Sequence, residues 1–175
     1  YMILTDGNSH NLALSLQLSR SSIDNPIYTR RGSQFTLGLK ITPPYSIIKG
    51  TTDAEFAQMT TSEKYNLLEY HKWKFSGKVF TPLTQDGKLV LMTRAEFGYL
   101  GHYNKNAKSP FESFYMGGDG MSSYSSYSTE YISMRGYQSG SLTPYDPAVG
   151  RNMGYVYNKF TMELRYPISL EQDAT

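Results

Sequence analysis

Residues 12–19 read LALSLQLS, a stretch in which leucine occupies every second position. Successive side chains of a β-strand point to opposite faces, so the leucines share one face, and alanine, serine and glutamine share the other. The stretch therefore predicts a β-strand with one apolar face.

Four further stretches show the same alternation, at residues 34–41, 71–79, 88–100 and 156–166. The last two exceed the roughly 5–6 residues typical of soluble strands and fit the roughly 9–11 residues of a tilted membrane strand. We therefore predict an all-β fold, a partial transmembrane antiparallel β-barrel of about five long strands. A soluble β-sandwich with its charges in water shows the same alternation and stays an alternative at this point. The predicted outward-facing residues are Leu12, Leu14, Leu16, Phe35, Leu37 and Leu39, and the predicted inward-facing residues are Lys40, Lys72, Lys74, Glu96, Lys159 and Glu163.

The connections between these strands alternate in length. Residues 21–32 and 82–87 are short, whereas residues 43–68 and 101–152 are long. Outer-membrane barrels have short periplasmic turns and long extracellular loops, and we assign the connections accordingly. Within the first long loop, residues 62–68 fit either a short helix or the lead-in to the third strand.

Composition narrows the class of protein. The chain has 175 residues, 14% aromatic residues, no cysteine and a net charge of +2. The aromatic content and the small charge argue against disorder and against a nucleic-acid surface. The absence of cysteine excludes disulfides and thiolate sites within these residues. Because bacterial barrels use eight or more strands, we expect residues 1–175 to be a fragment of one larger barrel domain.

The sequence offers no pattern typical of an active site. His10, His71 and His102 lack metal-binding spacing, and the serine-rich residues 122–128 lack a nucleophile-elbow motif. The glycines at 117–120 lack the lysine of a phosphate-binding loop. We therefore predict no catalytic residue, no metal, no cofactor and no enzymatic activity.

Two short motifs lie in the second long loop, within an order of features that covers nearly the whole chain. Residues 114–118 read FYMGG, and residues 134–137 read MRGY. They follow the turn DNPIYTRRG at 24–32 and the turn PLTQDG at 82–87, and they precede the strand that contains ELRYP at 163–167. This order resembles the bacterial surface antigen family of outer-membrane protein assembly factors of BamA type.

The resemblance implies a 16-stranded barrel behind periplasmic POTRA domains, with this chain as about the ninth to thirteenth strands. It also implies that the loop arginine folds into the lumen and pairs with an acidic residue of the wall, which in this sequence is Glu163. Two departures are the methionine in place of valine or isoleucine, and the long spacing from residue 119 to residue 130, which extends the loop. The implied site residues are Phe114, Tyr115, Gly117 and Gly118 at the start of the loop, the motif Met134, Arg135, Gly136 and Tyr137, and the partner Glu163.

The function implied by the resemblance is the folding and insertion of β-barrel proteins into the bacterial outer membrane. The implied partners are outer-membrane lipid, unfolded β-barrel client proteins and accessory assembly lipoproteins, with no nucleic acid. Three alternatives stay open: a polypeptide secretion pore of the two-partner type, a passive porin, and a tyrosine-rich soluble or surface β-sandwich that binds ligands through its loops.

Overall fold

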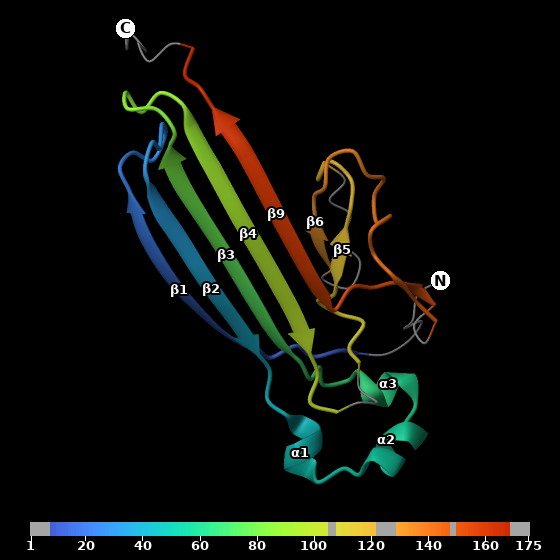
Figure 1. Cartoon of the computed structure of the whole chain (residues 1–175). Helices are drawn as coiled ribbons and strands as arrows, with labels where there is room; N and C mark the ends of the chain where they lie inside the picture. The colour runs from blue at the N-terminus through green and yellow to red at the C-terminus, as the bar shows by residue number, and fades with distance from the viewer. Residues whose placement is uncertain (1–7, 105–107, 122–128, 148–149, 169–175) are drawn as a thin grey trace, which may run out of the picture. The chain divides into compact units, whose positions relative to one another are not determined.

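The computed structural model describes residues 8–104, 108–121, 129–147 and 150–168, and the serine-rich stretch at 122–128 lies outside them. Strands provide the framework, with short helices in one connection (Figure 1). The long strands are β1 (Leu14–Ile23), β2 (Gly32–Ile41), β3 (His71–Pro82), β4 (Val90–Gly101) and β9 (Val156–Arg165). The short elements are α1 (Tyr45–Lys49), α2 (Asp53–Gln58), α3 (Thr61–Lys64), β5 (Phe114–Met116), β6 (Glu130–Ile132), β7 (Tyr145–Asp146) and β8 (Arg151–Asn152).

The five long strands form one sheet in the order β1-β2-β3-β4-β9. Neighbouring strands run in opposite directions, and each is 10 or 12 residues long (Figure 1). In the part of the chain that the structure describes, β1 and β9 remain as open edges of this sheet. The predicted all-β fold and partial barrel are thus confirmed, and the five predicted strands lie where the alternation put them.

The two faces of the sheet differ as the alternation predicts. The leucines of β1 lie on the outer face, where Leu14 is 69% and Leu16 is 55% exposed. Phe160 and Met162 of β9, each 78% exposed, follow the alternation of their own strand in the same way. On the inner face of β3, by contrast, Lys72 is buried. The leucines of β1 therefore do not form a closed soluble core, because their side chains point away from the protein interior.

The chain forms two compact units, each of which contains one part of the long strands. The loop-end unit comprises residues 1–16, 39–73 and 98–157, and the turn-end unit comprises residues 17–38, 74–97 and 158–175. Each unit has its own hydrophobic cluster. The cluster of the loop-end unit contains Leu68, Tyr70, Leu100, Phe114, Ile132 and Tyr157, and that of the turn-end unit contains Phe80, Val90 and Met92.

The turn between β1 and β2 is built around one carboxylate. Asp24 Oδ1 accepts hydrogen bonds from the backbone N–H groups of Asn25, Arg30 and Arg31 at 2.9, 3.0 and 3.3 Å. Gly32 ends the turn at φ +116°, and a Cβ there would lie 1.9 Å from the carbonyl oxygen of Ser22. Asp favours turns because its carboxylate accepts hydrogen bonds from nearby backbone N–H groups. These hydrogen bonds stabilise the short connection between β1 and β2.

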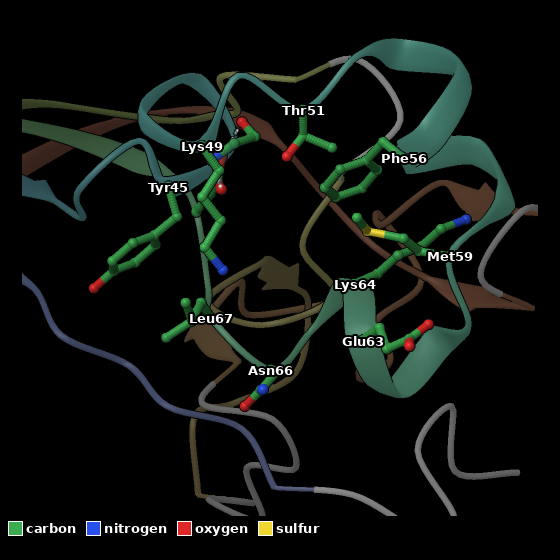
Figure 2. A pocket seen from close by; sticks show the side chains of 11 residues that line it. Tyr45, Lys49, Thr51, Phe56, Met59, Glu63, Lys64, Asn66 and Leu67 are labelled. Atoms are coloured by element: carbon green, nitrogen blue, oxygen red, sulfur yellow. Dashed lines mark hydrogen bonds between the residues drawn. The ribbon is translucent and has the colours of Figure 1, made fainter.

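The connection from β2 to β3 contains three short helices around a cavity (Figure 2). Each of the two alternatives for residues 62–68 holds for one part of them: α3 spans Thr61–Lys64, and residues 65–68 are not helical and lead toward β3. The alternation gave no sign of α1 and α2. Helix α2 begins with a capping box, in which Thr52 and Glu55 each bond the other's backbone N–H. Among the described residues, no helix is long and apolar enough to cross a membrane.

Candidate functional site

The first arm of the second long loop, residues 108–118, packs on the inner face of the sheet. Phe114 is fully buried, and its ring meets the ring of Tyr157 edge to face at 4.7 Å. A Cβ on Gly98 of β4 would lie 2.1 Å from the Tyr157 ring and 2.8 Å from Phe114. The aromatic pair therefore fits against the wall because residue 98 has no side chain.

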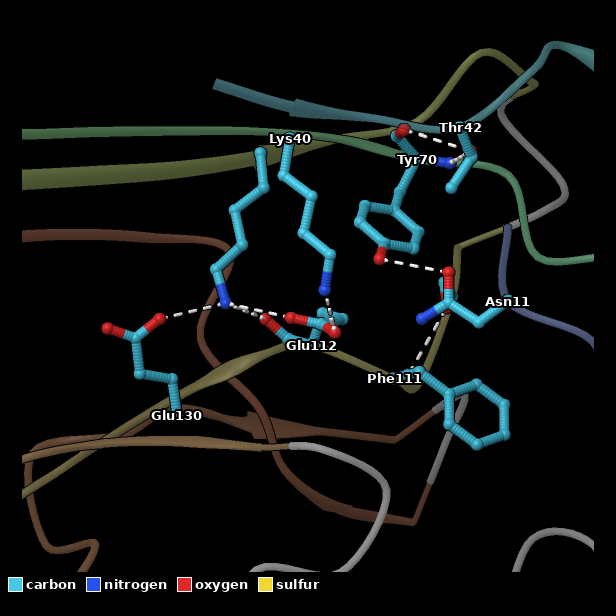
Figure 3. A network of polar contacts seen from close by, with 9 residues as sticks. Asn11, Lys40, Thr42, Tyr70, Phe111, Glu112 and Glu130 are labelled. Atoms are coloured by element: carbon cyan, nitrogen blue, oxygen red, sulfur yellow. Dashed lines mark hydrogen bonds and ion pairs between the residues drawn. The ribbon is translucent and has the colours of Figure 1, made fainter. Parts of the chain in front are cut away.

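Beside this aromatic pair lies a cluster of four charges, Lys40, Lys72, Glu112 and Glu130, of which Lys72 and Glu112 are buried (Figure 3). Lys40 Nζ lies 2.6 Å from Glu112 Oε1, and Lys72 Nζ lies 3.3 Å from Glu112 Oε2. Lys72 Nζ also lies 2.9 Å from Glu130 Oε2. The side chain of Lys72 is only 4% exposed. Two positive and two negative groups thus neutralise one another, as buried charges must.

Glu112 occupies the centre of this cluster. Both of its carboxylate oxygens face lysines, and its backbone carbonyl accepts a third hydrogen bond from Lys72 Nζ at 3.0 Å. Its φ is +65°, which makes it the one non-glycine residue with positive φ among those described. That conformation is uncommon for a residue with a side chain, and it persists where the surroundings fix it. Lys72 also lies over the Phe114 ring, 4.7 Å from its centre, which joins the ionic and aromatic contacts.

The backbone brings the two predicted motifs together. Gly118 N donates to Tyr137 O at 3.0 Å, and Met134 N donates to Gly118 O at 2.8 Å. Strands β5 and β6 pair in parallel, with Phe114 opposite Glu130. Gly136 has a φ of +86°, a left-handed conformation that glycine adopts without strain. The FYMGG and MRGY segments therefore form one folded part of the loop, and main-chain hydrogen bonds hold them together.

The predicted pairing of Arg135 with Glu163 stays a prediction. Arg135 and Tyr137 are exposed residues of the loop-end unit. Glu163 belongs to the turn-end unit, where its carboxylate lies 2.8 Å from Arg165 Nε. Among the described residues no ion pair involves Arg135.

Sequence reasoning missed Glu112 and Glu130. It placed Lys40 and Lys72 on the inner face but assigned them no acidic partner. Two inward lysines on adjacent strands require counter-charges when they are buried, and that requirement was the available signal. Glu112 stands two residues before the FYMGG motif, and Glu130 stands four residues before MRGY, so both acids adjoin the motifs already identified.

Two tyrosines of the loop-end unit lie beside Lys108 at the start of the arm: the Tyr65 hydroxyl donates to the Lys108 carbonyl at 3.3 Å, and Lys108 Nζ lies 5.6 Å from the centre of the Tyr155 ring. Burial raises the pKa of the Tyr65 phenol, and the nearby Asp146 carboxylate raises it further. Burial and Asp146 also raise the pKa of Tyr155, whose hydroxyl donates to Asp146 Oδ2 at 3.3 Å. Both phenols therefore stay neutral hydrogen-bond donors at physiological pH. Within the described residues, no group of three His, Asp or Glu side chains is placed to hold a metal ion.

Comparisons with known proteins agree with this fold. Residues 2–174 match the Omp85 superfamily domain. No curated protein matches the sequence. Among solved structures, the chain resembles the crystal structure of BamA from Haemophilus ducreyi lacking POTRA domains 1–3, with a TM-score of 0.58 and 19% sequence identity. The match covers 93% of this chain and 26% of that one, so this chain spans about a quarter of its length.

Proposed function

The chain belongs to the Omp85 superfamily and to the bacterial outer membrane, and on this premise we propose that it serves the folding and insertion of β-barrel proteins into that membrane. Its part in that process is to form barrel wall and to hold the long loop against the inner face of the wall. The process lowers an insertion barrier and involves no covalent chemistry, so the proposed function is not enzymatic.

The observation that carries the proposal is the family match over nearly the whole chain, combined with a loop arm packed on the inner face of the sheet. A barrel whose interior is filled by a folded loop keeps its wall in one shape while strands pair elsewhere. In this proposal the clients are unfolded β-barrel proteins, and outer-membrane lipid and accessory lipoproteins are the other partners.

The test uses the native protein reconstituted into liposomes. A urea-unfolded β-barrel client is added, and its folding is followed by the change in gel mobility of the unheated sample. We expect faster client folding in these liposomes than in empty ones. Equal rates in the two would contradict the proposal.

A second measurement separates assembly from secretion. The protein is depleted from cells, and the amounts of folded outer-membrane barrels and of exported polypeptides are compared. Assembly predicts that folded barrels decline first. Normal barrel levels, with an exported polypeptide retained in the periplasm, would instead assign the chain to a secretion pore.

A further inference from the structure

We propose that Glu112 is a positioning residue that locks the arm at residues 108–118 to the barrel wall, and that this lock is separate from any contact of Arg135. For its consequence in barrel assembly the inference rests on the function proposed above. The lock itself concerns only where the loop lies, and it is measured independently of that function.

Glu112 ties the arm to two neighbouring strands at once. One carboxylate oxygen forms an ion pair with Lys40 of β2, and the other forms an ion pair with Lys72 of β3. The backbone carbonyl of Glu112 also accepts a hydrogen bond from the Lys72 ammonium. Charge-assisted hydrogen bonds are the strong class, and three of them converge on one residue.

The second acid extends the lock to the return segment of the loop. Glu130 begins β6, binds Lys72 through its carboxylate, and donates its backbone N–H to the Ser113 carbonyl at 2.9 Å. Lys72 therefore has an acidic partner on each side of the loop. Arg151 fixes the preceding residues, because its guanidinium donates to the Pro110 carbonyl. Glu112 thus stands between anchored neighbours, which accounts for its left-handed backbone.

The charges predict which change releases the arm. Without the Glu112 carboxylate, Lys40 loses its acidic partner, and Lys72 keeps only Glu130. The side chain of Lys40 is 33% exposed and can turn to water, whereas that of Lys72 is 4% exposed and cannot. Losing Glu112 therefore leaves excess positive charge against the wall, and the arm has to move to hydrate it.

The first test reads the position of the arm directly. Ser113 is 1% exposed, and the sequence has no cysteine, so Ser113→Cys places a single buried thiol in the arm. A maleimide too polar to cross bilayers is applied to permeabilised membranes that hold the native protein. We expect the Glu112→Gln variant to label at least about tenfold faster than its parent, which corresponds to about 1.4 kcal/mol.

The matched control removes a wall carboxylate that the arm does not use. Glu96 lies between Arg94 and Lys159, at 3.4 and 3.9 Å, within the turn-end unit. Glu96→Gln should leave the labelling of residue 113 unchanged. Equal acceleration by Glu96→Gln and Glu112→Gln, or acceleration by neither, would overturn the inference. Gel mobility of the unheated protein verifies that each variant still forms its barrel.

A compensating change distinguishes stranded charge from lost packing. The double variant Glu112→Gln with Lys40→Met restores neutrality and leaves Lys72 paired with Glu130. We expect its labelling to return toward the parent rate. Labelling as fast as in Glu112→Gln alone would show that charge is not what holds the arm, and would overturn the lock.

The last part of the experiment tests whether this lock is independent of Arg135 and of the proposed function. If the two contacts are independent, Arg135→Ala and Glu112→Gln should accelerate labelling multiplicatively. If Arg135→Ala alone accelerates labelling, a double variant no faster than the quicker single one would overturn that independence. Faster labelling with unchanged client folding would uphold the lock and count against its role in assembly, whereas unchanged labelling rejects the lock whatever the client does.

Discussion

Two ion pairs with similar atomic distances have different surroundings in the two units. In the loop-end unit, Lys72 lies 2.9 Å from Glu130, and its side chain is 4% exposed. In the turn-end unit, Arg165 lies 2.8 Å from Glu163, and these side chains are 41% and 48% exposed. Distance alone would rank the two pairs as equals. Burial separates them, because water reaches both members of the second pair, whereas in the first pair it is excluded from Lys72 and reaches only Glu130, whose side chain is 27% exposed.

The cause of the difference is the loop rather than the strands. Lys72 and Glu163 both occupy inward positions of the same alternating pattern. Lys72 is buried because residues of the long loop bring an aromatic ring and two carboxylates onto it. The alternation thus determines which face a side chain takes, and a returning loop determines whether that face becomes an interior.

The largest expected effect is the loss of the buried lysine. Lys72→Met leaves unpaired the carboxylates that the lysine neutralised. Breaking a buried ion pair lowers the free energy of unfolding by about 3–5 kcal/mol. We expect the lower end, because Lys40 still neutralises part of Glu112. Arg165→Met should cost at most about 1 kcal/mol, as exposed pairs do. Urea unfolding of the native protein in liposomes measures both, and equal losses would remove the distinction between the two units.

The next prediction concerns the outer face. Leu18 stands in the middle of β1 and is 60% exposed, so in the membrane it meets lipid. Leu18→Arg should cost about 2–4 kcal/mol if it lies near the bilayer midplane. Its neighbour Ser19 points to the other face, where its hydroxyl lies 3.3 Å from that of Thr36. Ser19→Arg should be clearly milder in the same unfolding measurement, and a reversed order would mean that the two faces are exchanged.

Sequence reasoning predicted the parts of this structure that local patterns encode. Alternation over eight or more residues located the strands and the inward direction of Lys40 and Lys72. It did not find Glu112, because the partners of Glu112 lie 72 and 40 residues away and its left-handed backbone has no sequence signal. Helices α1 and α2 were not predicted from the sequence for a different reason. They have five and six residues, too few to show a helical period.

Two glycines give a smaller test of the same contrast. In the loop-end unit, a Cβ on Gly98 would meet Tyr157 at 2.1 Å. In the turn-end unit, the nearest atom to a Cβ on Gly38 would lie at 3.8 Å, an ordinary contact. Gly98→Ala should therefore cost about 1–3 kcal/mol through overpacking, whereas Gly38→Ala should be neutral or slightly stabilising. A neutral Gly98→Ala would show that the aromatic pair does not press on the wall.

The smallest expected effect is that the local stability of the turn between β1 and β2, in the turn-end unit, depends on pH. Desolvation alone would raise the pKa of Asp24, but hydrogen bonds from the backbone N–H groups of Arg30, Arg31 and Asn25 outweigh it and lower the pKa below its ordinary 3.8. A carboxyl with a lowered pKa in the folded state contributes stability above its ordinary pKa and loses that contribution as the pH falls through the lowered value. The turn should therefore stay ordered at neutral pH and loosen below about pH 3.8.

Hydrogen exchange of the Arg30 and Arg31 amides, corrected for the intrinsic effect of pH, measures this loosening where it occurs. Protection of these two amides should fall as Asp24 takes up its proton, because the protonated carboxyl accepts hydrogen bonds less well. The Asp24→Asn variant keeps a side-chain oxygen without a titratable charge, so its amides should show no such step. A step of equal size in Asp24→Asn would show that another group, and not this carboxylate, holds the turn.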